Sequence, residues 1–166
     1  PNVVEYTRKQ LPNCCIQVST NGDFLTEKIF RDLYRKGVDF FLVTNYDDGE
    51  NQKLSDLANK YPFHINLRSY KSFPKIDRAG QIFKRKKQSN APCMRPSSSI
   101  VINWKGDVLL CCQDFYGKYV MGNIEKDSLV SIWNSSKFWC YRNKLSKGQR
   151  ASIEICKYCD MTGDIA

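Results

Sequence analysis

The sequence lacks several features that would assign it to a common class of protein. No apolar run in its 166 residues approaches the ~20 residues that a membrane-spanning helix requires. No secretory segment is visible near the start, although the chain has eight cysteines. Helix-turn-helix, RNP-like aromatic and zinc-finger spacings are also missing. We therefore expect a cytoplasmic protein with reduced thiols, without a membrane span or a disulfide framework.

Acidic residues are the minority among the charged residues. Lys and Arg number 26 against 17 Asp and Glu, which leaves a formal net charge of +9. Much of this excess lies in one run at 84–87, Lys-Arg-Lys-Lys, inside a polar stretch. A charge run between patterned segments is typical of a solvated linker, and no nucleic-acid-binding motif accompanies it. We predict a basic linker over 84–92, between domains at 1–83 and 93–166, and no nucleic-acid partner.

The first half of the chain alternates between two kinds of pattern. Buried strands are predicted at 14–19, 38–44 and 63–68, and helices at 2–11, 26–36 and 51–60. Strands separated by helices of about a dozen residues indicate βαβ units and a parallel sheet. The fold class is therefore α/β in this half.

The third predicted strand has two different faces. Its residues alternate, with Phe63, Ile65 and Leu67 on one face and His64, Asn66 and Arg68 on the other. Gln17 and Ser19 form a similar polar set in the first strand. Parallel sheets are normally apolar on both faces. The polar face indicates either a lumen that binds a ligand or an edge that faces water.

The second half predicts a small α+β domain. Strands at 99–104 and 107–112 form a hairpin through Lys-Gly-Asp at 105–107, and a short strand follows near 122–124. A helix capped by Asp127 or Ser128 precedes another at 136–145. The aromatic residues of this last helix, Phe138, Trp139 and Tyr141, are expected in the core.

The cysteines of this half have an informative spacing. Cys93 is followed by Gly106 and by adjacent cysteines at 111 and 112, and Cys156-x2-Cys159 comes near the chain end. Four thiolates brought together by a fold can hold one iron–sulfur cluster or one zinc ion. Such a site would join the hairpin to the C-terminal segment.

This spacing resembles the SPASM domain of radical S-adenosylmethionine enzymes. Neighbouring segments agree with it: Gly-Asp-Val-Leu-Leu-Cys-Cys-Gln-Asp at 106–114, Met-Gly-Asn-Ile at 121–124 and Ser-Leu-Val-Ser-Ile-Trp-Asn at 128–134. Upstream, Val-Ser-Thr-Asn-Gly-Asp at 18–23 and Arg-Ala-Gly at 78–80 resemble parts of the catalytic barrel of that family. The resemblance implies a partial (βα) barrel with parallel strands, followed by a small α+β cluster domain.

Other hallmarks of the family are missing from this chain. There is no Cys-x3-Cys-x2-Cys motif for the catalytic cluster and no Gly-Gly-Glu-Pro. Because the chain also begins at Pro1, we expect the C-terminal part of a longer enzyme, with the N-terminal barrel segment elsewhere. The seventh cysteine of a full SPASM pattern is replaced by Ile165. This implies the shortened twitch form, with one auxiliary [4Fe–4S] cluster.

Four of the eight cysteines are the best candidates for metal ligands. Cys156 and Cys159 form the firmest pair, Cys111 matches the Gly-x4-Cys position of the family, and Cys93 opens the hairpin. Cys112 should point away from Cys111 if both lie on a strand. The remaining cysteines, Cys14, Cys15 and Cys140, are expected to be buried packing residues. Zinc is the alternative metal, although only one Cys-x2-Cys pair is present.

The resemblance also implies an activity for the intact enzyme. The barrel would bind S-adenosylmethionine, and Thr44, Asn66 and Arg68 are the candidate contacts on successive strands. We expect the segment alone to be inactive, with a peptide or a small molecule as the substrate of the whole enzyme. The alternative is a non-catalytic module, held together by zinc or a cluster, that binds a peptide or another acidic partner.

Overall fold

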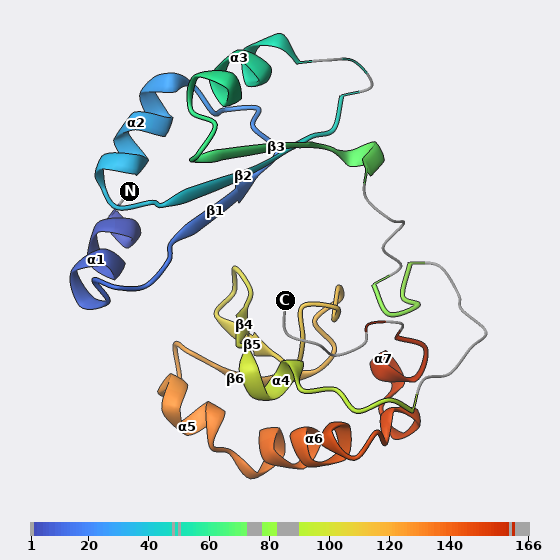
Figure 1. The fold of residues 1–166 in the computed structure, drawn as a ribbon. Helices are drawn as coiled ribbons and strands as arrows, with labels where there is room; N and C mark the ends of the chain where they lie inside the picture. The colour runs from blue at the N-terminus through green and yellow to red at the C-terminus, as the bar shows by residue number, and fades with distance from the viewer. Residues whose placement is uncertain are drawn as a thin grey trace. The chain divides into compact units, whose positions relative to one another are not determined.

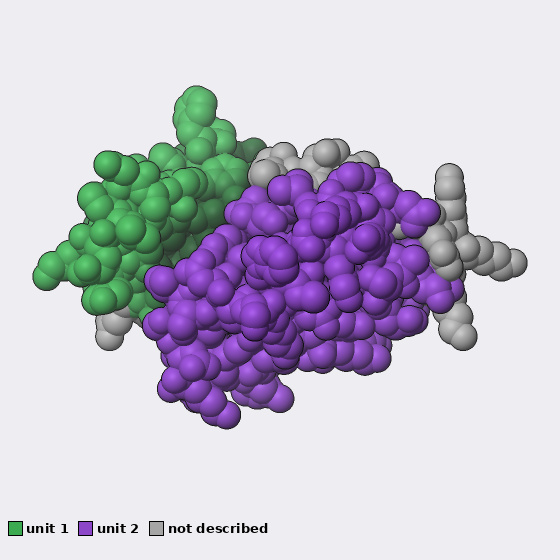
Figure 2. Space-filling view, turned by 90° about the horizontal axis from the view of Figure 1, so that it is seen from below, with its two compact units in different colours: residues 1–74 green, residues 75–166 purple. Residues whose placement is uncertain are grey.

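The chain forms two compact units, residues 1–74 and 75–166 (Figure 2). The computed structural model describes residues 2–47, 49, 51–72, 78–82, 90–159 and 161. The division between the units, after residue 74, comes before the linker that was expected at 84–92. Residues 78–82 belong to the second unit, where Arg78 and Gln81 donate to the carbonyls of Cys112 and Gln113 at 3.4 and 2.6 Å. The basic run at 84–87 lies outside the described residues.

The first unit contains a three-stranded parallel sheet. Strands β1 (Gln17–Thr20), β2 (Phe40–Asn45) and β3 (Ile65–Ser69) pair in the order β1-β2-β3. Helices α1 (Asn2–Gln10), α2 (Glu27–Arg35) and α3 (Gln52–Lys60) accompany it, and a short 3-10 turn, η1 (Tyr70–Ser72), follows β3. The parallel α/β pattern predicted from the sequence is therefore confirmed for these strands (Figure 1).

Capping residues determine where α2 and α3 begin. Thr26 Oγ1 accepts a hydrogen bond from the Ile29 amide at 3.2 Å, and Asn51 Oδ1 accepts one from Leu54 at 3.3 Å. These side chains satisfy amides that the first turn of a helix leaves without a partner. Both helices then bury apolar side chains against one face of the sheet. The core of this unit consists of Leu25, Phe30, Val38, Phe41, Val43, Leu54, Leu57 and Ile65.

The start of β3 differs from the prediction. The strand begins at Ile65, two residues later than expected, and Phe63 lies in the preceding turn with 89% of its surface exposed. His64 also precedes the strand, and its ring packs edge-on against Tyr34 of α2 at 4.6 Å between centroids. His64 therefore contacts a helix and does not belong to the polar face formed by Asn66 and Arg68.

The second unit is a short antiparallel sheet with helices. Strands β4 (Val101–Ile102), β5 (Asp107–Leu109) and β6 (Val120–Asn123) pair in sequence order. The other elements are α4 (Arg95–Ser98), α5 (Leu129–Trp133), α6 (Ser136–Ser146), η2 (Arg150–Ser152) and α7 (Glu154–Lys157). Ser128 is the N-cap of α5, and its Oγ accepts from the Ser131 amide. This arrangement agrees with the α+β domain predicted from the sequence.

Hydrogen bonds within the β4–β5 turn hold it in place. Asn103 Oδ1 accepts from the amides of Lys105 and Asp107, and Asn123 Nδ2 donates to the Asp107 carboxylate at 2.9 Å. The bonds from Asn123 and Asn103 lower the pKa of Asp107, because they stabilise its charged form. These bonds hold β4 and β5 in place, and with them the start of the loop that follows β5.

The core of the second unit lies between the sheet and α6. It includes Val108, Leu110, Met121, Ile132, Phe138, Leu145, Ile153 and Ile155. Phe138 is fully buried, as expected, but Trp139 is 63% exposed, because it is turned about 100° away from Phe138 around the helix axis. Within the described part of the chain, every helix is too short or too polar to cross a lipid bilayer.

Replacing Gly148 by Ala should destabilise the second unit by about 2 kcal/mol or more. Gly148 has φ +72°, and a Cβ there would lie 2.1 Å from the Asn90 carbonyl oxygen. Gly117→Ala is the matched control, because φ is +62° and its Cβ would meet only Leu109, at 3.7 Å. All three tryptophans, Trp104, Trp133 and Trp139, lie in this unit, so their fluorescence during urea unfolding reports its stability. An equal loss of unfolding free energy in Gly148→Ala and Gly117→Ala would contradict the clash at Asn90.

Candidate metal centre

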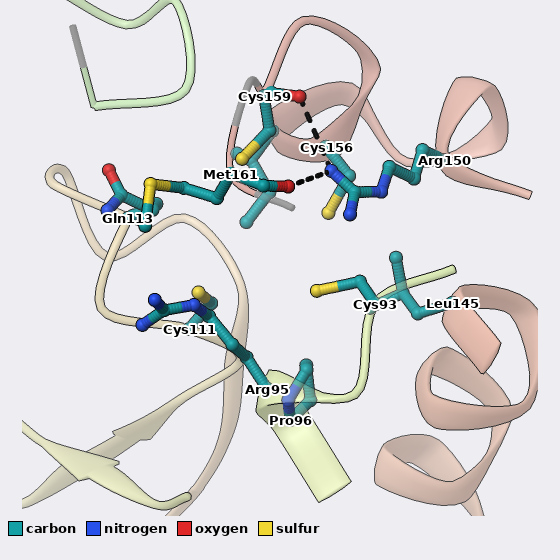
Figure 3. Close-up of a pocket in the computed structure, with 11 residues that line it drawn as sticks. Cys93, Arg95, Pro96, Cys111, Gln113, Leu145, Arg150, Cys156, Cys159 and Met161 are labelled. Carbon is teal, nitrogen blue, oxygen red and sulfur yellow. Dashed lines mark hydrogen bonds between the residues drawn. The ribbon is translucent and has the colours of Figure 1, made fainter. Parts of the chain in front are cut away.

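Four cysteines surround one cavity in the second unit. Cys93, Cys111, Cys156 and Cys159 line it, together with the apolar side chains of Pro96, Leu145 and Ile155. Figure 3 shows the four side chains arranged around a common space. They come from three separate segments: the residues before α4, the loop after β5, and the end of α7 with the turn beyond it. The structure thus brings together the four cysteines selected from the sequence.

Backbone hydrogen bonds position three of these cysteines. The Cys93 amide donates to the Leu145 carbonyl in the last turn of α6 at 2.9 Å. The Cys156 amide donates to Ile153 at 2.8 Å, and the Cys159 amide donates to Cys156 at 3.2 Å. Cys156 and Cys159 therefore lie on one tight turn, which is the arrangement that lets a Cys-x2-Cys pair face a single centre.

A buried carboxylate organises the loop that carries Cys111. Asp114 is only 2% exposed, and its two oxygens accept from the amides of Lys118 and Tyr119 at 3.0 and 2.7 Å. Its own amide donates to the Cys111 carbonyl at 3.1 Å. A buried carboxylate is tolerated where such bonds replace its hydration. Asp114 therefore determines the course of the loop after β5, and with it the position of Cys111.

Arg150 connects the segments that carry the other cysteines. Its side chain is 1% exposed, and its guanidinium donates to Ala91 and Pro92, just before Cys93, at 2.7 and 3.1 Å. It also donates to the carbonyls of Cys159 and Met161 at 3.3 and 2.7 Å (Figure 3). A guanidinium offers five N–H groups in a rigid planar fork, so it can satisfy several carbonyls at once. One buried cation thus holds both ends of the site together.

Cys111 and Cys112 have different surroundings. Cys111 lines the cavity, whereas Cys112 is exposed and lies 4.0 Å from Arg95 Nη1. The sequence argument used strand alternation, but β5 ends at Leu109, so both cysteines lie in the loop after it and the alternation does not apply to them. The Cys111 thiol is hydrogen-bonded to Cys112, which raises the pKa of Cys111 and lowers that of Cys112.

Burial also acts on the thiols inside the cavity. It raises the pKa of Cys156 to about 12, with a smaller contribution in the same direction from Cys159 and Cys93. At neutral pH the thiol is therefore protonated in the absence of a metal. A cationic centre would reverse this preference, because thiolates are the ligand form and metal binding releases their protons.

The residues present fit an iron–sulfur cluster. Four thiols are the usual ligand set of a [4Fe–4S] cluster, and the guanidinium of Arg150 supplies positive charge beside thiolates. In the described part of the chain, no three Cys, His, Asp or Glu side chains are arranged to hold a single metal ion. No observation of the described residues favours zinc over a cluster.

The remaining cysteines differ from the prediction that they are buried. Cys14 is half-buried, but Cys15 and Cys140 are exposed. Cys15 comes before β1 begins at Gln17, and so is not part of the buried strand that the sequence indicated. Cys140 lies on a side of α6 that does not face the core.

The three candidate contacts for S-adenosylmethionine share one face of the sheet in the first unit. Thr44 of β2 pairs with Arg68 of β3, and Leu42 pairs with Asn66. Paired residues and residues two apart on a strand point to the same side, so Thr44, Asn66 and Arg68 lie together. Arg68 Nε donates to Asn66 Oδ1 at 3.2 Å, which agrees with this placement. Helices α2 and α3 cover the opposite face, which carries Phe41, Val43 and Ile65.

Sequence reasoning missed the roles of four residues at the cysteine site. Arg95, Gln113 and Arg150 line the cavity, and Asp114 supports it from behind. The only signal available for Arg150 was a cation six residues before Cys156, and basic residues are so common in this chain that the signal had no weight.

Comparisons with known proteins agree with this site. A family model, SPASM, described as an iron–sulfur cluster-binding domain, matches residues 93–160. The S-adenosyl-L-methionine-dependent 2-deoxy-scyllo-inosamine dehydrogenase of Niallia circulans is 31% identical over 162 residues, which are 95% of this chain and 65% of that protein. This chain therefore spans less than two thirds of that relative.

Two solved structures resemble the chain. One is a crystal structure of BtrN in complex with AdoMet and 2-DOIA, with a TM-score of 0.82, 31% identity, and coverage of 95% of this chain and 65% of that one. The other is selenomethionine BtrN in an open conformation, with a TM-score of 0.71, 29% identity and coverage of 98% and 68%. Residues 93–160 match the SPASM domain, and nearly the whole chain is similar to a radical S-adenosylmethionine enzyme. The resemblance seen in the sequence is confirmed.

Replacing Cys111 by Ala should empty the site, while Cys112→Ala should retain its metal. Cys111 lines the cavity and Cys112 is exposed, so we expect only the first substitution to remove a ligand. Because metal binding is coupled to folding, Cys111→Ala should also lose several kcal/mol of stability, up to about 10. Iron analysis after anaerobic reconstitution measures the difference. Loss of iron from Cys112→Ala with retention in Cys111→Ala would reverse the assignment.

Proposed function

We propose that this chain is the auxiliary-cluster portion of a radical S-adenosylmethionine enzyme. Cys93, Cys111, Cys156 and Cys159 would hold one [4Fe–4S] cluster, which accepts and donates single electrons when bound. The observation that carries the proposal is the meeting of these four thiols at one cavity inside the SPASM domain. Four protein ligands leave no open iron site, which favours electron transfer or a structural role over direct binding of substrate.

The protein contributes position and electrostatics to this cluster. Arg150 and Asp114 hold the loops that present the thiols, and Pro96, Leu145 and Ile155 form apolar walls. Such walls limit the access of water, and solvent exposure is one of the factors that sets the potential of a cluster. Met161 also lines the cavity, so its thioether completes the wall beyond Cys159.

We further propose that the parallel sheet of the first unit is part of the enzyme's (βα) barrel. Thr44, Asn66 and Arg68 would contact S-adenosylmethionine from its open polar face, and they provide a hydroxyl, an amide and a cation for a ribose and a carboxylate. Thr44 and Arg68 lie towards the carboxyl ends of β2 and β3, which supports this, since ligands of open α/β sheets bind there.

The reaction class of the whole enzyme follows from its relative. A dehydrogenase whose name specifies 2-deoxy-scyllo-inosamine as substrate favours a small molecule over a peptide. We propose oxidation of a small, hydroxyl-bearing substrate, with the catalytic cluster supplied by an N-terminal barrel segment outside this sequence. The enzyme would work in the cytoplasm, where thiols stay reduced. The non-catalytic module is disfavoured, because binding alone would not require this sheet.

Anaerobic reconstitution should load the chain with about four irons and four sulfides. The four thiols around one cavity are the physical reason, and iron and sulfide analysis with the visible thiolate-to-iron absorption measures the result. Cys93→Ala removes one of the four proposed ligands and should hold less than half of the iron that the unaltered chain holds. Stoichiometric zinc without iron uptake by the unaltered chain would falsify the cluster assignment.

The chain alone should not cleave S-adenosylmethionine under strong reductant. The iron that coordinates the cofactor in this family sits on Cys-x3-Cys-x2-Cys, and that spacing is missing here. Chromatography should find no 5′-deoxyadenosine above a protein-free control, with an intact radical S-adenosylmethionine enzyme assayed in parallel. Its formation by the reconstituted chain would mean that the catalytic cluster has been misplaced.

A further inference from the structure

We infer that Arg95 raises the reduction potential of the cluster held by the four cysteines. This inference rests on the proposed function and goes beyond it, because it assigns a role to a residue that is not a ligand. Arg95 is the first residue of α4, and its side chain lines the same cavity as Cys93, Cys111, Cys156 and Cys159 (Figure 3).

The guanidinium of Arg95 has unused hydrogen-bonding capacity at the cavity. Its Nε is buried and has no hydrogen-bond partner among the described residues. Its Nη1 lies 4.0 Å from Cys112 Sγ, at the edge of the site. A buried N–H without a partner costs about 1–3 kcal/mol, so such groups call for an explanation. Sulfur atoms of a cluster and its thiolates accept hydrogen bonds from groups in this position.

The charge of Arg95 is not neutralised by neighbouring carboxylates. The described residues form no ion pair with it, and the buried carboxylate of the loop after β5, Asp114, already accepts hydrogen bonds from the amides of Lys118 and Tyr119 on both oxygens. The other cation at the cavity, Arg150, is occupied by four backbone carbonyls. Arg95 is thus the cavity cation with a free N–H group in the described part of the chain.

A cation in this position favours the reduced cluster. Four thiolates make the centre anionic, and reduction adds one more negative charge to it. A fixed guanidinium in a partly buried site stabilises the added charge more than the oxidised state, because the attraction grows with the charge of the centre. Hydrogen bonds to cluster sulfur act in the same direction. Arg95 therefore makes the cluster easier to reduce, which suits a centre that accepts an electron.

The test is a redox titration of the reconstituted chain, followed by electron paramagnetic resonance of the reduced cluster. At the midpoint of the unaltered chain, Arg95→Gln should lower the ratio of reduced to oxidised cluster about tenfold, which is a shift of about 59 mV to lower potential. Arg95→Lys keeps the charge but loses the planar guanidinium. Its midpoint potential should lie between those of the unaltered chain and Arg95→Gln. Lys105→Gln removes one charge from the exposed hairpin turn, away from the cavity, and should leave the midpoint unchanged.

Each outcome decides between specific explanations. A midpoint of Arg95→Gln equal to that of the unaltered chain overturns the role of Arg95 but leaves the cluster assignment intact. If Arg95→Gln loses the cluster but Arg95→Lys retains it, the contact between residue 95 and the cluster is supported. The lysine variant keeps the positive charge but not the planar guanidinium. Loss from both variants, with native tryptophan fluorescence, overturns a role based on charge. An unaltered chain that takes up no iron contradicts the proposed function itself, and this inference with it.

Discussion

The second unit depends on the hydrogen bonds of one buried guanidinium. Arg150 binds the carbonyls of Ala91 and Pro92, 59 and 58 residues earlier in the chain, and those of Cys159 and Met161 just after it. The guanidinium itself is buried, so an N–H group of Arg150 that lost its carbonyl acceptor would cost about 1–3 kcal/mol. Cys93 and Cys159 sit directly beside these carbonyls, so the same contact that closes the fold also defines the site.

The site combines features that oppose one another until a metal centre is bound. Burial raises the pKa of Cys156 and favours its neutral thiol, whereas Arg150 and Arg95 place positive charge at the same cavity. Thiolates bound to iron would resolve this conflict, because they match the cations and no longer need protons. The cavity is therefore better suited to a charged sulfur-bound centre than to a set of free thiols. The same reasoning links cluster binding to the stability of the whole unit.

Part of the fold could be read directly from local patterns. Thr26 and Asn51 marked the starts of α2 and α3, and alternation of strands and helices identified the parallel sheet. Boundaries were less predictable, since Phe63 and His64 continue the apolar and polar alternation of β3 but lie in the turn before it. Cys112 shows a related difficulty. The prediction that it points away from Cys111 assumed a strand, but both residues lie in the loop after β5, where their thiols are hydrogen-bonded to each other.

The sequence by itself determined which residues could be ligands. Cysteine spacing is a property of the chain, and a Cys-x2-Cys pair is local enough to act as a unit wherever the fold places it. Only the tertiary structure decided how three distant segments meet and which other groups face the cavity. Arg95 and Arg150 carry no recognisable spacing, and in a chain with 26 basic residues their charge is unremarkable. Their roles arise from burial and from the direction of their N–H groups, which depend on packing between segments far apart in the sequence.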